Sequence, residues 1–519
     1  MRLLNTNTGQ FRWVESPAEA KYAVLSHVWS RAGEQSYQDL LRIQHEATAG
    51  DAKDDVDESE GSVLRAASSK IRNACARALA DGVEYIWMDF CCIDRTSSAE
   101  VADAVLSMYG WYAGAAVCYA YLDDVEADED PRLPNAKFRW SRWHTRGWTL
   151  PELIAPKALT FLAADWEVLS TKHELVEVLE AVTGVDQGVL THDVPLGSIP
   201  VARRMSWAAK RLTTRKEDEA YALLGLFGVK MPIMYGEGAH AFIRLQEEIL
   251  KITADQSLFV WDASTSDCAL DAEVHDETRH TLLASSPAAF ARSAGVKTLP
   301  WEELVGPKER AQLEGELPTY ESTPHGIRMG MPLLSVGPVV RLALLPCVDE
   351  DGHRLALVLK KAQDATVHTV GMAGWQEVRA RYRASLRSRP WGIDPAHTTE
   401  DSASETFTRV VKLPKPWPRT VPLSKIYVAH RPLCALATRP PAAQPGMVAH
   451  RGIGQRRDDL IRVDRNDCSL CGVVRGCVAD AVDMVVCMLS FSGVLVLLLI
   501  LPMSLFLAII MYLRYPYLG

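Results

Sequence analysis

The stretch YAVLSHVW, residues 22–29, is an apolar run with only Ser26 and His27 to interrupt it. Such a run predicts a strand buried in a parallel sheet. Residues 63–82 follow with apolar side chains at helical spacing, and Gly82 marks the end of this amphipathic helix. The next apolar run, VEYIWMDF at 83–90, predicts a second strand. Strand, helix and strand in this order predict a parallel sheet that helices cover on both faces.

The same alternation continues along the first half of the chain. Ser97 and Glu100 form one S-x-x-E capping box, and Thr171 and Glu174 form a T-x-x-E box before a helix that Gly184 ends. Further strands are expected at 115–122 and 158–162, and three closing helices at about 201–212, 217–227 and 239–253. We therefore expect an α/β fold with a parallel sheet flanked by helices, followed by a helical closure.

The character of the sequence changes near residue 258. GIRMGMPLL, VRLALLPCV and HRLALVLKK read as strands, and DEDG at 349–352 reads as the turn between the last two. The expected organisation is an α/β domain at 1–257 with an acidic insertion at 46–62, a smaller β-rich domain at 258–430, a linker at 431–483 and a transmembrane anchor at 484–513.

Residues 484–513 carry no charge and are apolar on every helical face. Thirty helical residues would span about 45 Å, which is enough to cross a bilayer. We expect a single-pass C-terminal anchor that leaves the bulk of the chain cytosolic. The N-terminus lacks the apolar core of a signal peptide, and the scattered cysteines are typical of a reduced compartment.

Composition argues against several classes of function. The formal net charge of -9 is unsuited to nucleic-acid binding through a general basic surface. No Walker A, G-x-G-x-x-G or H-E-x-x-H motif is present. Cys468 and Cys471, with Cys477, lack a second ligand pair at zinc spacing, so we predict no metal site.

Ligand sites of parallel sheets lie beyond the carboxyl ends of the strands. The polar and aromatic candidates at those ends are Ser26, His27, Trp29, Asp89 and Asp94. Each also has a structural interpretation, because Asp is common in turns, His27 suits a buried hydrogen bond and tryptophans are mostly core residues. YGEG at 235–238 is either an anion-binding turn or a plain helix start.

Glu152 lies in RGWTLPELIAP, residues 146–156, and has two interpretations. In the first, Thr149 is the N-cap of a short helix and Glu152 is its N3 residue, which completes a capping box. In the second, the carboxylate carries chemistry beside the strand ends. The spacing fits both, and the alternatives stay open at this point.

Four blocks resemble, in order, the motifs of the fungal heterokaryon-incompatibility (HET) domain over residues 20–250: YAVLSHVW, GVEYIWMDFCCIDRTSSAE, FRWSRWHTRGWTLPELIAP and TTRKEDEAYALLGLFGVKMPIMYGEGAHAFIRLQEEI. The resemblance implies a self/non-self recognition protein whose HET domain triggers growth arrest or cell death. It also implies assembly as a homo-oligomer or with other incompatibility proteins. Family members often have Gln where Pro151 stands and Asn where Leu106 stands, and neither change removes a candidate carboxylate.

The HET domain also resembles, distantly, the Toll/interleukin-1-receptor (TIR) domain, some members of which cleave NAD with the glutamate of a W-x-x-x-E stretch. WTLPE places Trp148 and Glu152 at that spacing. The resemblance implies that Glu152 is catalytic, with NAD as a substrate rather than a bound cofactor. Ser26, His27, Trp29, Asp89, Asp94 and Trp148 would then contact the substrate. Non-enzymatic assembly, or toxicity of the membrane segment, are the alternatives.

Overall fold

The computed structural model describes part of the chain, all of it within Met1–Pro440. The predicted linker at 431–483, the predicted anchor at 484–513 and most of the acidic insertion lie outside the described residues. None of the helices in the described part is long and apolar enough to span a bilayer. The described residues are 1–30, 32–50, 62–261, 281–304, 320–323, 326–335, 340–361, 367–370, 373–374, 407–408, 410–413 and 423–429.

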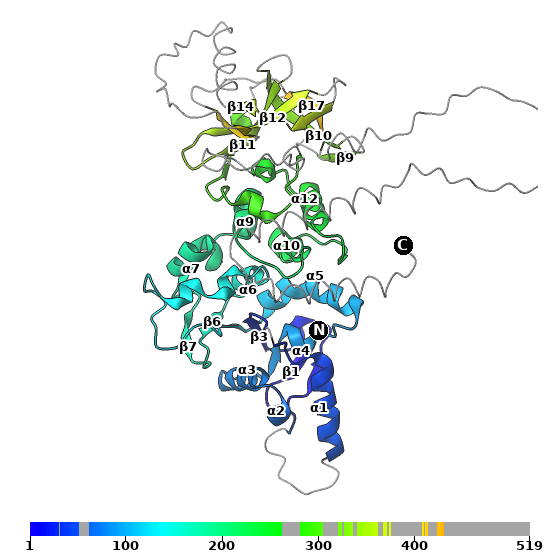
Figure 1. The fold of residues 1–519 in the computed structure, drawn as a ribbon, viewed down its shortest axis with the longest axis vertical. Coiled ribbons are helices and arrows are strands. Elements are labelled where there is room, and N and C mark those ends of the chain that lie inside the picture. The colour runs from blue at the N-terminus through cyan, green and yellow to red at the C-terminus, as the bar shows by residue number, and fades with distance from the viewer. Residues whose placement is uncertain are drawn as a thin grey trace, which may run out of the picture. The chain divides into compact units, whose positions relative to one another are not determined.

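The N-terminal half is built on a seven-stranded sheet of order β2-β1-β4-β3-β5-β6-β7. Figure 1 labels β1, β3, β6 and β7 of this sheet. The four central strands, β4, β3, β5 and β6, are parallel, as the sequence predicts. Both edges are antiparallel and were not predicted, so the sheet is mixed. The strands are β1 (Arg2–Asn5), β2 (Phe11–Trp13), β3 (Tyr22–His27), β4 (Tyr85–Trp87), β5 (Val117–Tyr121), β6 (Leu159–Leu162) and β7 (Val168–Thr171).

Helices follow most strands, and several differ from expectation. The single helix expected at 63–82 is two helices, because Ser68 in an extended conformation caps a new start by accepting from Ile71 N. The strand expected at 83–90 ends at Trp87, and a helical turn follows it. The helices are α1 (Tyr37–Gly50), α2 (Ser62–Ala66), α3 (Ser69–Ala80), α4 (Asp89–Cys92), α5 (Ser98–Gly114), α6 (Thr149–Ile154), α7 (Val176–Thr183), α8 (Gln187–Leu190), α9 (Val201–Ser206), α10 (Asp218–Tyr221), α11 (Leu224–Phe227) and α12 (His240–Ile252).

Short 3-10 segments connect these elements, namely η1 (Pro17–Glu19), η2 (Lys137–Trp140), η3 (Arg142–Thr145), η4 (Leu196–Ser198), η5 (Gln256–Phe259), η7 (Pro287–Phe290) and η8 (Trp301–Glu303). Two predicted helix signals are confirmed. Ser97 accepts from Glu100 N at 3.3 Å at the start of α5. Gly184, with φ of +73°, ends α7 in the left-handed conformation that glycine adopts without strain.

A second sheet follows, of order β16-β12-β13-β17-β10-β11-β8 with β9 beside β10. The three quoted apolar runs form β10, β11 and β12, which confirms strands there, while the expected domain boundaries stay predictions. Its strands are β8 (Lys297–Thr298), β9 (Glu321–Thr323), β10 (Gly326–Ser335), β11 (Val340–Val348), β12 (Arg354–Lys361), β13 (Val367–Val370), β16 (Val410–Leu413) and β17 (Leu423–Ala429), and β14 (Ala373–Gly374) pairs with β15 (Phe407–Thr408) separately.

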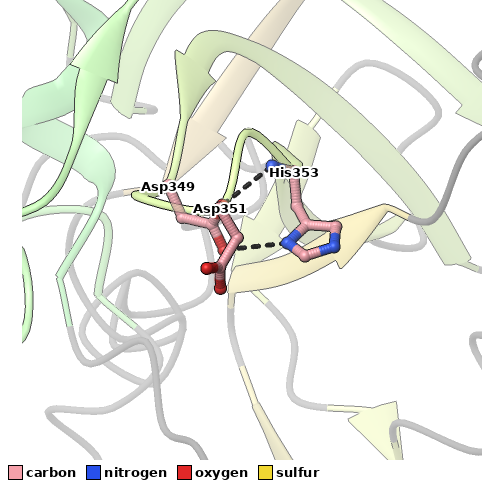
Figure 2. A group of neighbouring side chains, drawn as sticks. All are labelled: Asp349, Asp351 and His353. Carbon is pink, nitrogen blue, oxygen red and sulfur yellow. Dashed lines mark hydrogen bonds and ion pairs between the residues drawn. The ribbon is translucent and has the colours of Figure 1, made fainter.

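The DEDG segment is the predicted turn between β11 and β12. Asp349 accepts from His353 N at 2.8 Å and lies 3.3 Å from its Nδ1 (Figure 2). Asp349, Asp351 and His353 offer ligand atoms within 4.8 Å of one another. The contacts drawn are those of a hairpin turn, in which an Asp side chain bonds the backbone that follows it.

Tryptophans divide between the core and the surface. Trp87 and Trp143 are fully buried, and Trp87 packs edge-on against Trp111 with ring centroids 5.3 Å apart. Trp140, however, is 78% exposed and Trp29 39% exposed, so the expectation that they are core residues is wrong for these two.

Candidate functional site

Glu152 is buried on α6, with 6% of its surface exposed. Its Oε2 accepts a hydrogen bond from the Ser26 hydroxyl at the end of β3. That hydroxyl in turn accepts from Trp143 Nε1 at 2.8 Å. Because Trp143 supplies the donor, the Ser26 proton is left for Glu152. The three side chains therefore form a directed chain from Trp143 through Ser26 to the carboxyl group.

The predicted capping box at Thr149 is wrong. The residue before α6, Trp148, already has helical φ and ψ angles of −67° and −28°, so no extended N-cap precedes the helix. The Thr149 hydroxyl lies 2.5 Å from Trp143 O and 3.0 Å from Arg146 O. Glu152 points to Ser26 instead of back toward Thr149 N. Helix capping therefore does not explain this glutamate.

Two buried cations hold the ends of α6. Arg211 Nη1 donates to Arg146 O at 2.8 Å and to Thr149 Oγ1 at 2.9 Å before the helix. Lys172 Nζ donates to Leu153 O at 3.2 Å and to Pro156 O after it. Cations suit the orphan carbonyls of a helix C-terminus. Burial lowers the pKa of Lys172 to about 8 and that of Arg211 to about 9.

The surroundings of Glu152 favour its neutral form. Burial raises the pKa of Glu152 to about 8, and the hydrogen bond from Ser26 only partly offsets this. The nearby charge of Asp89 raises the pKa further, while Arg211 lowers it. At neutral pH the group is therefore a carboxylic acid, because desolvation disfavours the ionised form. Such a shift at a cavity is typical of functional carboxyl groups.

Glu152 lines a small cavity between α5, α6 and the α10–α11 segment. Its volume is about 10 Å³, which is the space of roughly one water molecule. Aromatic rings from α5, from α10 and from Trp148, which directly precedes α6, surround it. The cavity, called here the Glu152 pocket, is lined by Val105, Met108, Tyr109, Tyr112, Trp148, Pro151, Glu152, Tyr221, Ala222 and Gly225. Trp148, predicted to contact a substrate, is thus brought to Glu152.

His27, Trp29 and Asp89 meet in a second cluster. His27 Nε2 lies 3.2 Å from Asp89 Oδ1, and Trp29 Nε1 donates to Asp89 Oδ2 at 2.9 Å. Ser26 and His27 are neighbours on β3, so their side chains leave opposite faces of the strand. This alternation explains why Ser26 joins Glu152 while His27 joins Asp89. The sequence prediction grouped all of them at one crevice.

Residues that the sequence analysis missed complete the second cluster. Lys70 Nζ lies 3.2 Å from His27 Nδ1 and 2.5 Å from Glu34 Oε1. Arg95 donates to Asp89 at 3.2 Å and stacks 4.2 Å over the Trp29 ring. Although burial opposes it, the hydrogen bond from His27 and the charge of Arg95 hold the pKa of Asp89 below its usual value. Asp89 is therefore ionised where Glu152 is neutral.

Asp94 belongs to neither group. It accepts from Thr96 N at 2.9 Å and from Gln38 Nε2 at 2.5 Å, at the surface. These bonds match its interpretation as a turn residue. At YGEG, Gly236 N and Gly238 N donate to Glu217 Oε1 at 2.7 and 3.0 Å. The anion at this turn is therefore the carboxylate of the chain's own Glu217.

Comparison with known proteins agrees with the motif blocks. Residues 22–139, which include β3 to β5, match the family model "Heterokaryon incompatibility protein (HET)". Residues 240–351 match a domain of unknown function (DUF8212). The vegetative incompatibility protein HET-E-1 of Podospora anserina is 37% identical over 261 residues.

That alignment covers 48% of this chain and 18% of the relative, so the chain spans less than a fifth of the relative's length. No solved structure matches the chain. The family model and the relative both carry the name of heterokaryon or vegetative incompatibility, and they support a role in incompatibility. On these matches, residues 22–139 are similar to the HET domain of fungal incompatibility proteins.

Proposed function

We propose that this HET domain triggers growth arrest or cell death during incompatibility by cleaving NAD at Glu152. The observation that carries the proposal is the environment of Glu152. Its carboxyl group is buried and does not cap the helix. It is oriented by a hydrogen bond from Ser26 and lines a pocket with aromatic walls. The W-x-x-x-E spacing of Trp148 and Glu152, seen in some NAD-cleaving TIR domains, supports the same reaction.

The chemistry follows from the groups present. The bond between the nicotinamide nitrogen and ribose C1′ breaks, and its electron pair leaves with the nicotinamide. Hydration of the site when it opens lets Glu152 ionise, and the carboxylate stabilises the resulting oxocarbenium ion. Water then attacks C1′ and loses a proton to give ADP-ribose. The rings of Tyr109, Tyr112, Trp148 and Tyr221 suit a flat pyridinium cation, which aromatic faces attract. The hydrogen bond from Ser26 fixes the orientation of the carboxyl group.

Signalling through assembly is the second candidate function. It is favoured by the exposure of Trp140 at 78% and Leu133 at 53%, close together in sequence. Exposed aromatic residues are enriched at protein interfaces. In this case a second copy of the chain, or another incompatibility protein, would bind there, and no NAD would be consumed.

Induced expression of the full chain in a filamentous fungus tests the function. We expect growth to stop and cellular NAD to fall before viability is lost, because the loss of NAD is the cause of death in this proposal. Time courses of NAD and of dye uptake measure both. Death at unchanged NAD would contradict the enzymatic function and favour assembly. Growth without either effect would contradict both.

The uncharged run 484–513 motivates a further part of the proposal, that the chain acts at a membrane. We expect the full chain to stay with membranes after a carbonate wash, and a variant without 484–513 to move to the soluble fraction. The reason is that an uncharged, mostly apolar run of this length inserts into a bilayer more favourably than it dissolves in water. A full chain that washes off would contradict the anchor.

A further inference from the structure

Two very short helices form one side of the Glu152 pocket. α10 and α11 have four residues each, and with the residues between them they supply Tyr221, Ala222 and Gly225 to the lining. The facing wall is α5, and Glu152 lies on α6. The cavity of about 10 Å³ is far smaller than the pockets of several hundred Å³ that hold small-molecule ligands. A substrate therefore cannot reach Glu152 until one of these elements moves.

Gly225 sets how closely α11 approaches α5. A Cβ atom at this position would lie 2.2 Å from Tyr109 Cβ and 2.3 Å from its Cγ. Such contacts are impossible without a shift, and the atoms met are the rigid base of the side chain rather than its flexible end. Glycine weakens a helix by roughly 0.5–1 kcal/mol relative to alanine. The close approach of Tyr109 explains why a glycine is nevertheless present at position 225.

Hydrogen bonds to residues outside the pocket lining hold the two helices in place. The Tyr221 hydroxyl accepts from Met234 N at 2.8 Å and donates to Glu237 Oε1 at 2.7 Å. Tyr235 donates to Asp218 Oδ1 at 2.9 Å. At the other end, Arg204 Nη1 donates to Leu226 O at 2.9 Å. These bonds can be exchanged for bonds to water when the helices move. Leu223, Leu224 and Leu226 are buried, so opening also exposes apolar surface and the open state is rarely populated.

We propose that α10 and α11, residues 218–227, form a lid that closes over Glu152 in the resting chain and moves off α5 to admit substrate. The biological consequence of the lid rests on the proposed function, whereas the lid itself rests on the pocket. Tyr109 and Gly225 are its contact points. Gly228, with φ of +66°, ends α11 and permits the sharp change of chain direction beside the lid.

Dicyclohexylcarbodiimide, which modifies protonated carboxyl groups in apolar surroundings, reports on the lid without any assay of activity. The full chain is treated with the reagent, and peptide mass spectrometry follows labelling of Glu152 with time. In the wild type, labelling should be slow. Gly225→Ala forces α11 away from Tyr109, so Glu152 should be labelled about tenfold faster, in proportion to the open population. Tyr221→Phe removes two ties but keeps the ring, and should speed labelling in the same direction.

Gly110→Ala is the matched control. It makes the same substitution on α5, one residue from Tyr109, where an added Cβ meets nothing within 4 Å. It should label at the wild-type rate. Equal labelling of wild type and a folded Gly225→Ala or Tyr221→Phe variant overturns the lid, as does fast labelling of the wild type. If Gly225→Ala fails to fold, Tyr221→Phe decides. Faster labelling without loss of NAD leaves the lid standing and overturns the proposed function.

Discussion

Glu152→Gln should give a folded chain that neither kills nor consumes NAD. The amide matches the carboxyl group in size, and its oxygen can still accept the hydrogen bond from Ser26. The native group is also neutral at pH 7, because burial raises its pKa to about 8. The amide cannot, however, ionise when the pocket opens. Loss of one group that stabilises developing charge costs on the order of 100-fold or more in rate, so NAD in induced cells should stay at the uninduced level.

Glu174→Gln is the control for this substitution. Glu174 accepts from Ser170 Oγ at 2.8 Å and from Thr171 N at 3.1 Å, away from the pocket. The control variant should kill and consume NAD as the wild type does. Thermal unfolding measured beside activity shows whether each variant is folded. A folded Glu152→Gln chain that still kills would leave Glu152 as a buried structural acid.

The fold could be predicted wherever apolar runs were long. The runs that became β3, β5 and β6 are flanked by clear helix signals, and all of them lie in the parallel part of the sheet. The edge strands β1, β2 and β7 have three or four residues each and include polar side chains such as Arg2, Arg12 and Thr171, so no apolar run marks them in the sequence. β1 also pairs with β4, a segment distant in sequence, whereas β2 and β7 pair with their sequence neighbours β1 and β6.

The site shows the same limit. The proximity of His27, Trp29 and Asp89 could be predicted because the carboxyl ends of parallel strands share one edge, whereas Ser26 turns to the other face of β3 and meets Glu152. The role of Trp143 could not, because its partner Ser26 is 117 residues away. The capping box at Thr149 was inferred from spacing alone, and it failed because the chain before α6 is already helical. Local spacing predicts a helix start but does not show which way a carboxyl group turns.

Burial of Glu152 also predicts how stability changes with pH. The pKa of Glu152 is raised from 4.5 to about 8 in the folded chain, so between these pH values the native state holds a proton that the unfolded state has lost. The contribution of Glu152 to the free energy of unfolding is therefore fully present below pH 4.5 and is lost as the pH rises toward 8. The free energy of unfolding should fall by about 1.4 kcal/mol per pH unit, or by about 5 kcal/mol across the window.

Other buried groups titrate with the opposite sign. Burial lowers the pKa of His144 to about 3 and that of Lys172 to about 8. The free energy of unfolding therefore rises with pH up to about pH 6.5 through His144, and above about pH 8 through Lys172. Their effects are common to wild type and variant and cancel in the difference. Urea unfolding of wild type and Glu152→Gln at several pH values from 5 to 8 therefore isolates Glu152. The free energy of unfolding of Glu152→Gln should rise steadily relative to that of the wild type across this range. The difference between Glu174→Gln and the wild type should stay constant between pH 6 and 8. Parallel curves for wild type and Glu152→Gln would mean that Glu152 is ionised in the resting fold, and that the closed pocket does not hold a neutral acid.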